Sequence, residues 1–142
     1  MSSNGSRTGV TTEITVGLVT PDNGLLPLMA SLAYSVADPY AVTMAFEVGT
    51  DEPVEWALAR ELLAAALDAM EGIGDFQAWP SEPGGVKILH MSMTSPFGQA
   101  QFEASAEDIS AFLDRTFELV PSGQESAHLN LDAELAALFS EA

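Results

Sequence analysis

The feature that most constrains the fold is a set of short segments in which apolar or β-branched residues alternate with polar ones. Such a period of two is typical of strands that bury one face. Turn chemistry separates the segments, as in Pro21-Asp22-Asn23-Gly24 and in Ala37-Asp38-Pro39. Because the segments are close in sequence, we expect an antiparallel meander. The six predicted strands are 11–20, 28–36, 40–48, 75–79, 86–93 and 99–104.

Three helices are predicted between and after these strands. The first runs from about Val54 to Glu71, with an apolar stripe and terminating glycines behind it. The second begins at Ser105, a favourable capping residue, and stops before Pro121. The third runs from about Leu131 to Ser140. Strand runs separated by whole helices predict one α+β domain over residues 11–142, and the Ser/Gly-rich residues 1–10 are expected to be a disordered tail.

The charge balance limits the partners. Four basic residues stand against 21 acidic ones, which gives a formal net charge of −17. Since nucleic acids and anionic membranes are bound through Lys and Arg, this composition disfavours both and favours a basic protein partner. The acidity also has a simpler interpretation, which is that it only keeps the protein soluble.

The sequence also indicates in which cellular compartment the protein works. It contains no cysteine, so disulfides and thiolate metal sites are impossible. No apolar run approaches the roughly 20 residues that span a bilayer, and the first nine residues do not form a secretory signal. We therefore expect a cytoplasmic protein that does not insert into the membrane.

Residues that carry chemistry are sparse. His90 and His128 are the only histidines, and we expect a hydrogen-bonded structural residue and a surface residue, respectively. No phosphate-binding loop, dinucleotide fingerprint or zinc-protease motif occurs. We therefore assign no catalytic residue, cofactor or metal. A small hydrolase stays open as a hypothesis because triads are defined by geometry, and it predicts a deep polar pocket near one histidine.

Several short motifs follow one another in a fixed order, at residues 38–42, 54–56, 59–63, 72–75, 79–80, 95–98, 112–116 and 120–125. Together these motifs resemble one family, the SsgA-like sporulation proteins of actinobacteria. The C-terminal run from His128 to Leu135 looks most like the SsgB branch. The chain differs from the usual pattern at Ser31 to Ser35, which lacks a common arginine, and at Leu58, where an aromatic is common.

The resemblance implies a non-enzymatic cell division regulator. In the SsgB branch such proteins help to recruit the tubulin-like division protein FtsZ, so the implied partners are FtsZ and SsgA-like paralogues at the division septum. It also implies self-association, with a trimer as one suggested form, and a fold similar to the whirly-type single-stranded nucleic acid binders. The alternative function is accordingly a whirly-like nucleic acid-binding module, against which the acidity argues.

Most residues that carry the resemblance are expected to be structural. We expect turns around Pro39 and Pro96, buried anchors at Trp56 and Trp79, and an ion pair between Arg60 and Asp75. The family-signature residues are Asp38, Pro39, Tyr40, Trp56, Arg60, Gly74, Asp75, Trp79, Pro80, Pro96 and Gly98. The expected partner-binding surface is the apolar stripe of the last helix, formed by Leu131, Leu135, Leu138 and Phe139.

Overall fold

The computed structural model describes residues 8–49, 52–96 and 98–127, in which eight strands form one antiparallel sheet. Its order is β4-β3-β2-β1-β8-β7-β6-β5. The elements are β1 (Gly9–Val19), β2 (Leu25–Ser35), β3 (Asp38–Phe46), β4 (Val54–Ala59), α1 (Arg60–Ala66), β5 (Glu71–Ile73), β6 (Phe76–Ser81), η2 (Pro83–Gly85), β7 (Ile88–Ser95), β8 (Gly98–Ser105) and α2 (Ala106–Leu119).

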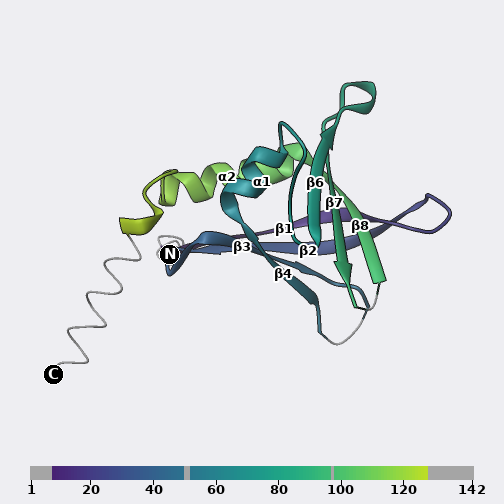
Figure 1. Cartoon of the computed structure of the whole chain (residues 1–142), viewed down its shortest axis with the longest axis horizontal. Helices are drawn as coiled ribbons and strands as arrows, with labels where there is room; N and C mark the ends of the chain where they lie inside the picture. The colour runs from purple at the N-terminus through teal and green to yellow at the C-terminus, as the bar shows by residue number, and fades with distance from the viewer. Residues whose placement is uncertain (1–7, 50–51, 97, 128–142) are drawn as a thin grey trace.

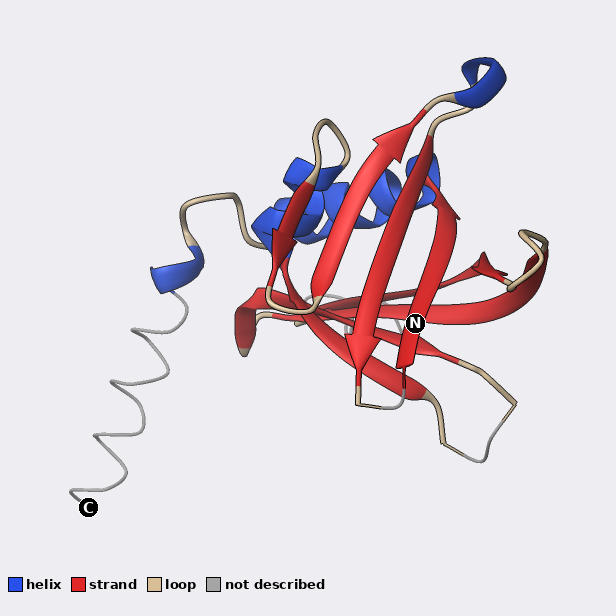
Figure 2. Cartoon of the chain, turned by 45° about the vertical axis from the view of Figure 1, so that its right-hand side comes forward, coloured by secondary structure: helices blue, strands red, loops and turns tan. Residues whose placement is uncertain are grey.

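The sheet consists of two meanders, β1 to β4 and β5 to β8. They join where β1 pairs with β8 at Gly17↔Glu103 and Leu18↔Phe102. The sheet curls into a half-barrel, and its two edge strands are β4 and β5. Both helices lie together on one side of it, while the β1–β2 and β6–β7 hairpins extend away from the body (Figures 1 and 2).

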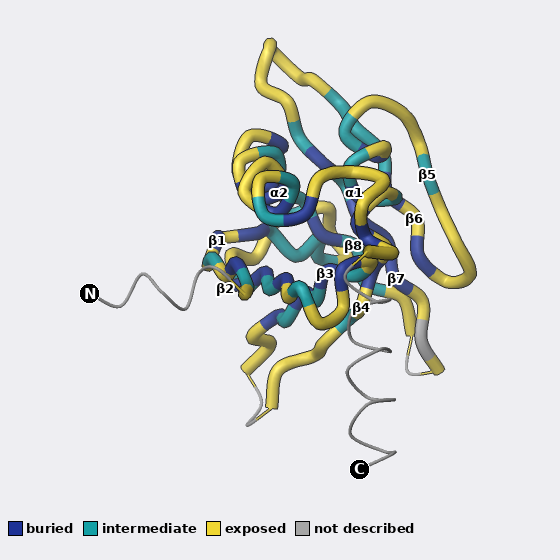
Figure 3. Tube along the Cα trace, turned by 90° about the vertical axis from the view of Figure 1, so that its left-hand side faces the viewer, coloured by how far each residue is buried: buried dark blue, intermediate teal, exposed yellow. Residues whose placement is uncertain are grey.

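The helices fill part of the curled interior. Since α1 directly follows β4 and precedes β5, it links one sheet edge to the other, and α2 packs over β1, β7 and β8. Alternate residues of the strands point inward toward these helices, as the buried positions in Figure 3 show. Across the interior the rings of Phe46 and Phe102 stack with centroids 4.2 Å apart. This contact joins the two meanders, and such pairs contribute about 0.5–1.5 kcal/mol beyond burial.

The predicted α+β class fits broadly, and each of the six predicted strands is present with shifted ends. The first predicted helix is wrong over its first third, because residues 54–59 form β4. There Val54, Trp56 and Leu58 alternate toward the interior, and β4 pairs with β3 from Ala41↔Ala59 to Phe46↔Val54. Tertiary pairing thus outweighs local helix propensity.

Three further differences concern single elements. The helix itself is short, from Arg60 to Ala66. β5 at Glu71–Ile73 is, after β4, the second strand that the periodicity did not predict. Gly9 and Val10 belong to β1, so the tail expected at residues 1–10 includes two strand residues. The predicted second helix is α2, and the Ser105 hydroxyl oxygen accepts a hydrogen bond from the Asp108 amide at 3.3 Å, as its capping role requires. The helix predicted at 131–140 lies outside the described residues.

In the described part of the chain, no helix combines the length and the apolar character that crossing a membrane requires.

Candidate functional site

The turn residues of the family signature lie close to their expected places. Asp38 opens β3 beside the β2–β3 turn and pairs with Ser35. Pro39 is buried, and its carbonyl oxygen accepts a hydrogen bond from the Tyr34 hydroxyl at 2.9 Å. Gly74 occupies the left-handed region with a φ of 57° in the β5–β6 turn, which explains why a glycine stands there.

Most of the remaining signature residues lie in the second meander, β5 to β8. The Asp75 carbonyl accepts the Thr94 amide at 3.0 Å, which closes the β5–β6 turn against β7. Trp79 and Pro80 lie in β6, where they pair with His90 and Leu89. Pro96 and Gly98 sit at the β7–β8 turn, and Tyr40 is exposed at the start of β3. Trp56 and Trp79 are half-buried rather than fully buried anchors.

Arg60 is a buried cation that makes three side-chain hydrogen bonds. Its side chain is 0% exposed. Its guanidinium donates to the carbonyl oxygens of Thr116 and Val120 at 3.0 and 2.8 Å and to Glu125 Oε2 at 2.8 Å. The guanidinium carbon also lies 4.1 Å from the centroid of the Phe117 ring. Arg60 therefore ties the start of α1 to the last turn of α2 and to the chain that follows.

The partner of Arg60 is Glu125 rather than Asp75, so that prediction is wrong. Arg60 points inward beneath α2, whereas Asp75 lies in the β5–β6 turn at the sheet edge. Glu125 is held in place by the Gly123 amide, which donates to Glu125 Oε1 at 3.0 Å. The hydrogen bond from Arg60 lowers the pKa of the Glu125 carboxyl, and burial raises the pKa of the nearby Tyr34 phenol. This arrangement is structural, because it fixes where the chain leaves α2.

His90 belongs to a row of side chains on the outward face of β6, β7 and β8. Its Nε2 lies 2.7 Å from the Ser81 hydroxyl, and its Nδ1 lies 3.6 Å from Glu103 Oε2. The imidazole also stacks on Trp79 at 5.3 Å between centroids and 3° between planes. The residue types match those of a hydrolytic triad, and sequence reasoning singled out His90 but neither Ser81 nor Glu103.

The setting of this row favours the structural role expected for His90. The row lies across three neighbouring strands on the face opposite the core residues Leu89 and Met91. The hydrolase hypothesis predicts a deep polar pocket at a histidine, whereas His90 lies on an outward sheet face. The 3.6 Å separation from Glu103 also exceeds hydrogen-bonding distance. No group of three or more potential metal ligands occurs among the described residues.

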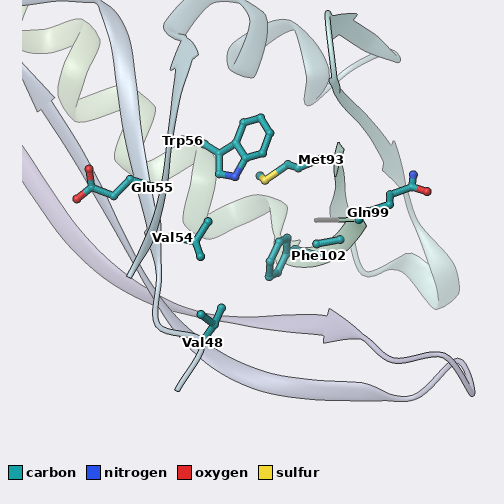
Figure 4. A pocket seen from close by; sticks show the side chains of 9 residues that line it. Val48, Val54, Glu55, Trp56, Met93, Gln99 and Phe102 are labelled. Carbon is teal, nitrogen blue, oxygen red and sulfur yellow. The ribbon is translucent and has the colours of Figure 1, made fainter. Parts of the chain in front are cut away.

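An apolar groove lies at the end of the half-barrel that the helices do not fill. It has a volume of about 550 Å³ and lies between the edge strand β4 and the β7–β8 hairpin. Trp56, Met93 and Phe102 face this space, and the Glu55 carboxylate points away from it (Figure 4). The remaining lining residues are Val48, Val54, Gly98, Gln99 and Ala100. Sequence reasoning missed the groove because it placed Val54 and Trp56 on a helix.

A second exposed apolar region lies on the β1–β2 hairpin. Leu25, Leu26 and Met29 of β2 are 54%, 50% and 42% exposed. Alternate residues of a strand face opposite sides, so Leu25 and Leu26 expose apolar surface on both faces of the hairpin. Exposed apolar surface of this kind is typical of protein contacts rather than of catalysis. The expected partner surface, Leu131 to Phe139, lies outside the described residues.

Comparison with known proteins agrees with the resemblance found in the sequence. Residues 28–125 match the family model described as Streptomyces sporulation and cell division protein, SsgA. The sporulation-specific cell division protein SsgB of Thermobifida fusca is 50% identical over 96% of this chain and 97% of its own. A crystal structure of an SsgA-like sporulation-specific cell division protein from that organism superimposes with a TM-score of 0.86 at 49% identity, covering 92% of this chain and 95% of the other.

A solved structure of SsgB from Streptomyces coelicolor is also similar, with a TM-score of 0.81 and 42% identity over 85% of this chain and 95% of the other. Mutations in that SsgB correlate with longitudinal cell division during sporulation. These names describe a cell division protein and no class of enzyme.

Proposed function

This chain belongs to the SsgA family of sporulation and cell division proteins, and on that premise we propose that it is a non-enzymatic adaptor that helps to position the tubulin-like division protein FtsZ at sporulation septa. The observation that carries the proposal is an apolar groove left open on an otherwise strongly acidic protein. An adaptor needs such a contact surface, and most of the side chains that line the groove are apolar.

The charges and the groove have separate tasks in this function. Apolar contact at the centre of an interface supplies most of the binding energy, whereas complementary charge speeds encounter and sets orientation. With 21 acidic residues against four basic ones, the chain attracts basic patches on other proteins. The adaptor works in the cytoplasm at the septum, without inserting into the membrane.

Self-association is part of the same proposal. The exposed apolar residues of the β1–β2 hairpin, Leu25, Leu26 and Met29, support a homo-oligomer, for which a trimer is the form we propose. A closed oligomer presents several grooves at once, and linked sites bind a polymer of repeated subunits more tightly than one site does. SsgA-like paralogues are the other proposed partners.

The test is direct binding of purified FtsZ to the full chain, immobilised for biolayer interferometry. We expect saturable binding whose association rate falls as salt rises, since screening weakens the attraction of exposed charges. An association rate that does not change with salt would remove the acidic surface from the mechanism. The absence of any binding at low salt would overturn the FtsZ role.

A second binding assay distinguishes the adaptor role from the alternative function, a whirly-like nucleic acid-binding module. Fluorescence anisotropy with a labelled single-stranded oligonucleotide at low salt should show no binding, because four basic residues stand against 21 acidic ones. Of the three cations in the described part of the chain, Arg60 and Lys87 are paired with carboxylates, which leaves Arg115 exposed on α2. Sub-micromolar affinity for the oligonucleotide would favour the whirly-like module instead.

A further inference from the structure

The groove lies beside an open sheet edge. β4 pairs with β3 on one side and is the end of the strand order, so its other side offers backbone N–H and C=O groups to a further strand. The inward residues of this edge are the groove residues Val54 and Trp56. A strand added to β4 would therefore lie in the opening of the half-barrel, with alternate side chains directed into the groove.

We propose that the groove and the β4 edge together bind an extended segment of a partner protein, in which apolar residues alternate with cationic ones. The apolar residues fill the space that Trp56, Met93 and Phe102 face. The cationic residues lie on the other face of the added strand, beside the exposed carboxylate of Glu55. Opposite charges across neighbouring strands stabilise a pair by about 0.2–1 kcal/mol.

Charge favours a cationic segment of another protein over two other possible occupants of the groove, the chain's own C-terminal residues and a second copy of the chain. The chain's own residues 128–142 contain Asp132, Glu134 and Glu141 and no Lys or Arg, so they bring like charge to Glu55. A second copy of the chain carries a net charge of −17 toward the same edge. A cationic strand from another protein meets neither repulsion. The proposal rests on the adaptor role and specifies the chemistry of the partner segment.

The probe is a fluorescein-labelled synthetic peptide of about nine residues, ~30 Å when extended, in which Val or Leu alternates with Lys or Thr. We expect it to bind the full chain in an anisotropy titration. Replacing its lysines with glutamates should weaken binding, and N-methylation of alternate backbone amides, which removes strand donors, should abolish it. Equal binding of all three peptides would overturn the proposal.

The variant Val54→Asp places a carboxylate at the groove, and because Val54 is already 45% exposed the substitution should be compatible with folding. We expect at least about a tenfold loss of peptide affinity, which corresponds to about 1.4 kcal/mol. The matched control Val86→Asp, at a valine that is 63% exposed between β6 and β7, should leave affinity unchanged. Equal effects of the two substitutions would overturn the groove as the site.

A spectroscopic measurement locates the peptide. Trp56 and Trp79 are the two tryptophans of the chain, so Trp79→Phe leaves Trp56 as the reporter. Peptide binding should shift its emission to shorter wavelength as the groove loses water. An unchanged spectrum at saturation would place the peptide elsewhere.

Competing occupants give distinct results. If Val54→Asp has a lower sedimentation mass than the parent protein, a second copy of the chain fills the groove. If Leu135→Asp binds the peptide more tightly than the parent does, the C-terminal segment fills it. Either result overturns the proposal. If FtsZ binds Val54→Asp normally and the peptide does not bind at all, the groove inference fails while the adaptor role stands. If the peptide binds and FtsZ does not, the adaptor role fails instead.

Discussion

Arg60 places a full positive charge where the structure excludes water, and five groups of the protein compensate for that placement. Two carbonyl oxygens, the Glu125 carboxylate and the rings of Tyr34 and Phe117 surround its guanidinium. Only Nε lacks a hydrogen-bond partner. The contact spans α1, β2, α2 and the segment after it, so the effect of one side chain extends over most of the helical layer.

Arg60→Ala should lower the free energy of unfolding by about 3–5 kcal/mol, because it leaves the buried Glu125 carboxylate without its countercharge. Chemical denaturation followed by circular dichroism measures the change. The control Arg115→Ala removes an exposed cation and should stay within about 0.5 kcal/mol of the parent. A loss for Arg60→Ala no larger than that of the control would contradict the structural role.

The pH dependence of stability should report the same pair. The pKa of Glu125 is lowered from its ordinary value of 4.5, chiefly by the hydrogen bond from Arg60. A carboxyl with a depressed folded-state pKa stabilises the fold above its unfolded pKa, and this contribution is lost as pH falls through the folded pKa. The stability advantage of the parent over Glu125→Gln should therefore be constant above about pH 5.5 and shrink below pH 4.5.

Parallel urea titrations of both proteins from neutral to acidic pH measure that difference. Subtracting the two curves cancels the titration of the other carboxylates. A stability difference that stays constant down to pH 3, or grows, would mean that the charge of Glu125 is not the source of the stability that the Arg60–Glu125 pair provides.

At the residue scale, sequence singled out Arg60 but not its partner. Arg60 stands out in the sequence because it is one of only four basic residues and lies beside an apolar helical stripe. Glu125 is 65 positions away, and the pair forms only because α1 is carried back under the end of α2 by the curled sheet. A contact of that sequence separation has no periodicity to reveal it.

At the level of elements, β4 and α1 show where local pattern stops being decisive. Residues 59–67 are rich in Ala and Leu and favour a helix, and the preceding Val54-Glu55-Trp56-Ala57-Leu58 fits either period over so short a run. Pairing with β3 selects the strand. By contrast, Ser105 with Glu107 and Asp108 marks the start of α2 correctly, because a capping side chain acts locally.

Because residues 54–59 were predicted as a helix and not as β4, the groove could not be predicted from the sequence. With Val54 and Trp56 on a helix there is no sheet edge and no groove, so the partner surface was sought in the last predicted helix instead. The groove depends on β4 lying opposite the β7–β8 hairpin. That relation is set by how the two meanders close on each other, which a single sequence does not encode in any short pattern.

At the scale of the whole molecule, the acidity that directs partner choice also opposes folding. A net charge of −17 on a chain of 142 residues makes the compact state repel itself, and the unfolded chain relieves that repulsion by expanding. The buried Arg60–Glu125 pair is shielded from salt by its surroundings, whereas the exposed carboxylates are not. Salt should thus act on the surface and leave the interior contact unchanged.

Adding KCl from about 10 mM to about 100 mM, which shortens the screening length from about 30 Å to about 10 Å, should therefore raise the melting temperature. Each 1 kcal/mol of relieved repulsion corresponds to about 2–8 °C in domains of this size range. The double variant Glu13→Lys, Glu118→Lys, at two exposed positions, reduces the repulsion and should show a smaller rise over the same range. Differential scanning calorimetry measures both. A melting temperature that falls with salt would mean that favourable ion pairs outweigh self-repulsion. An equal rise in the two proteins would mean that general salt effects outweigh it. In either case the acidic surface would not destabilise the fold, and partner binding would have no such destabilisation to offset.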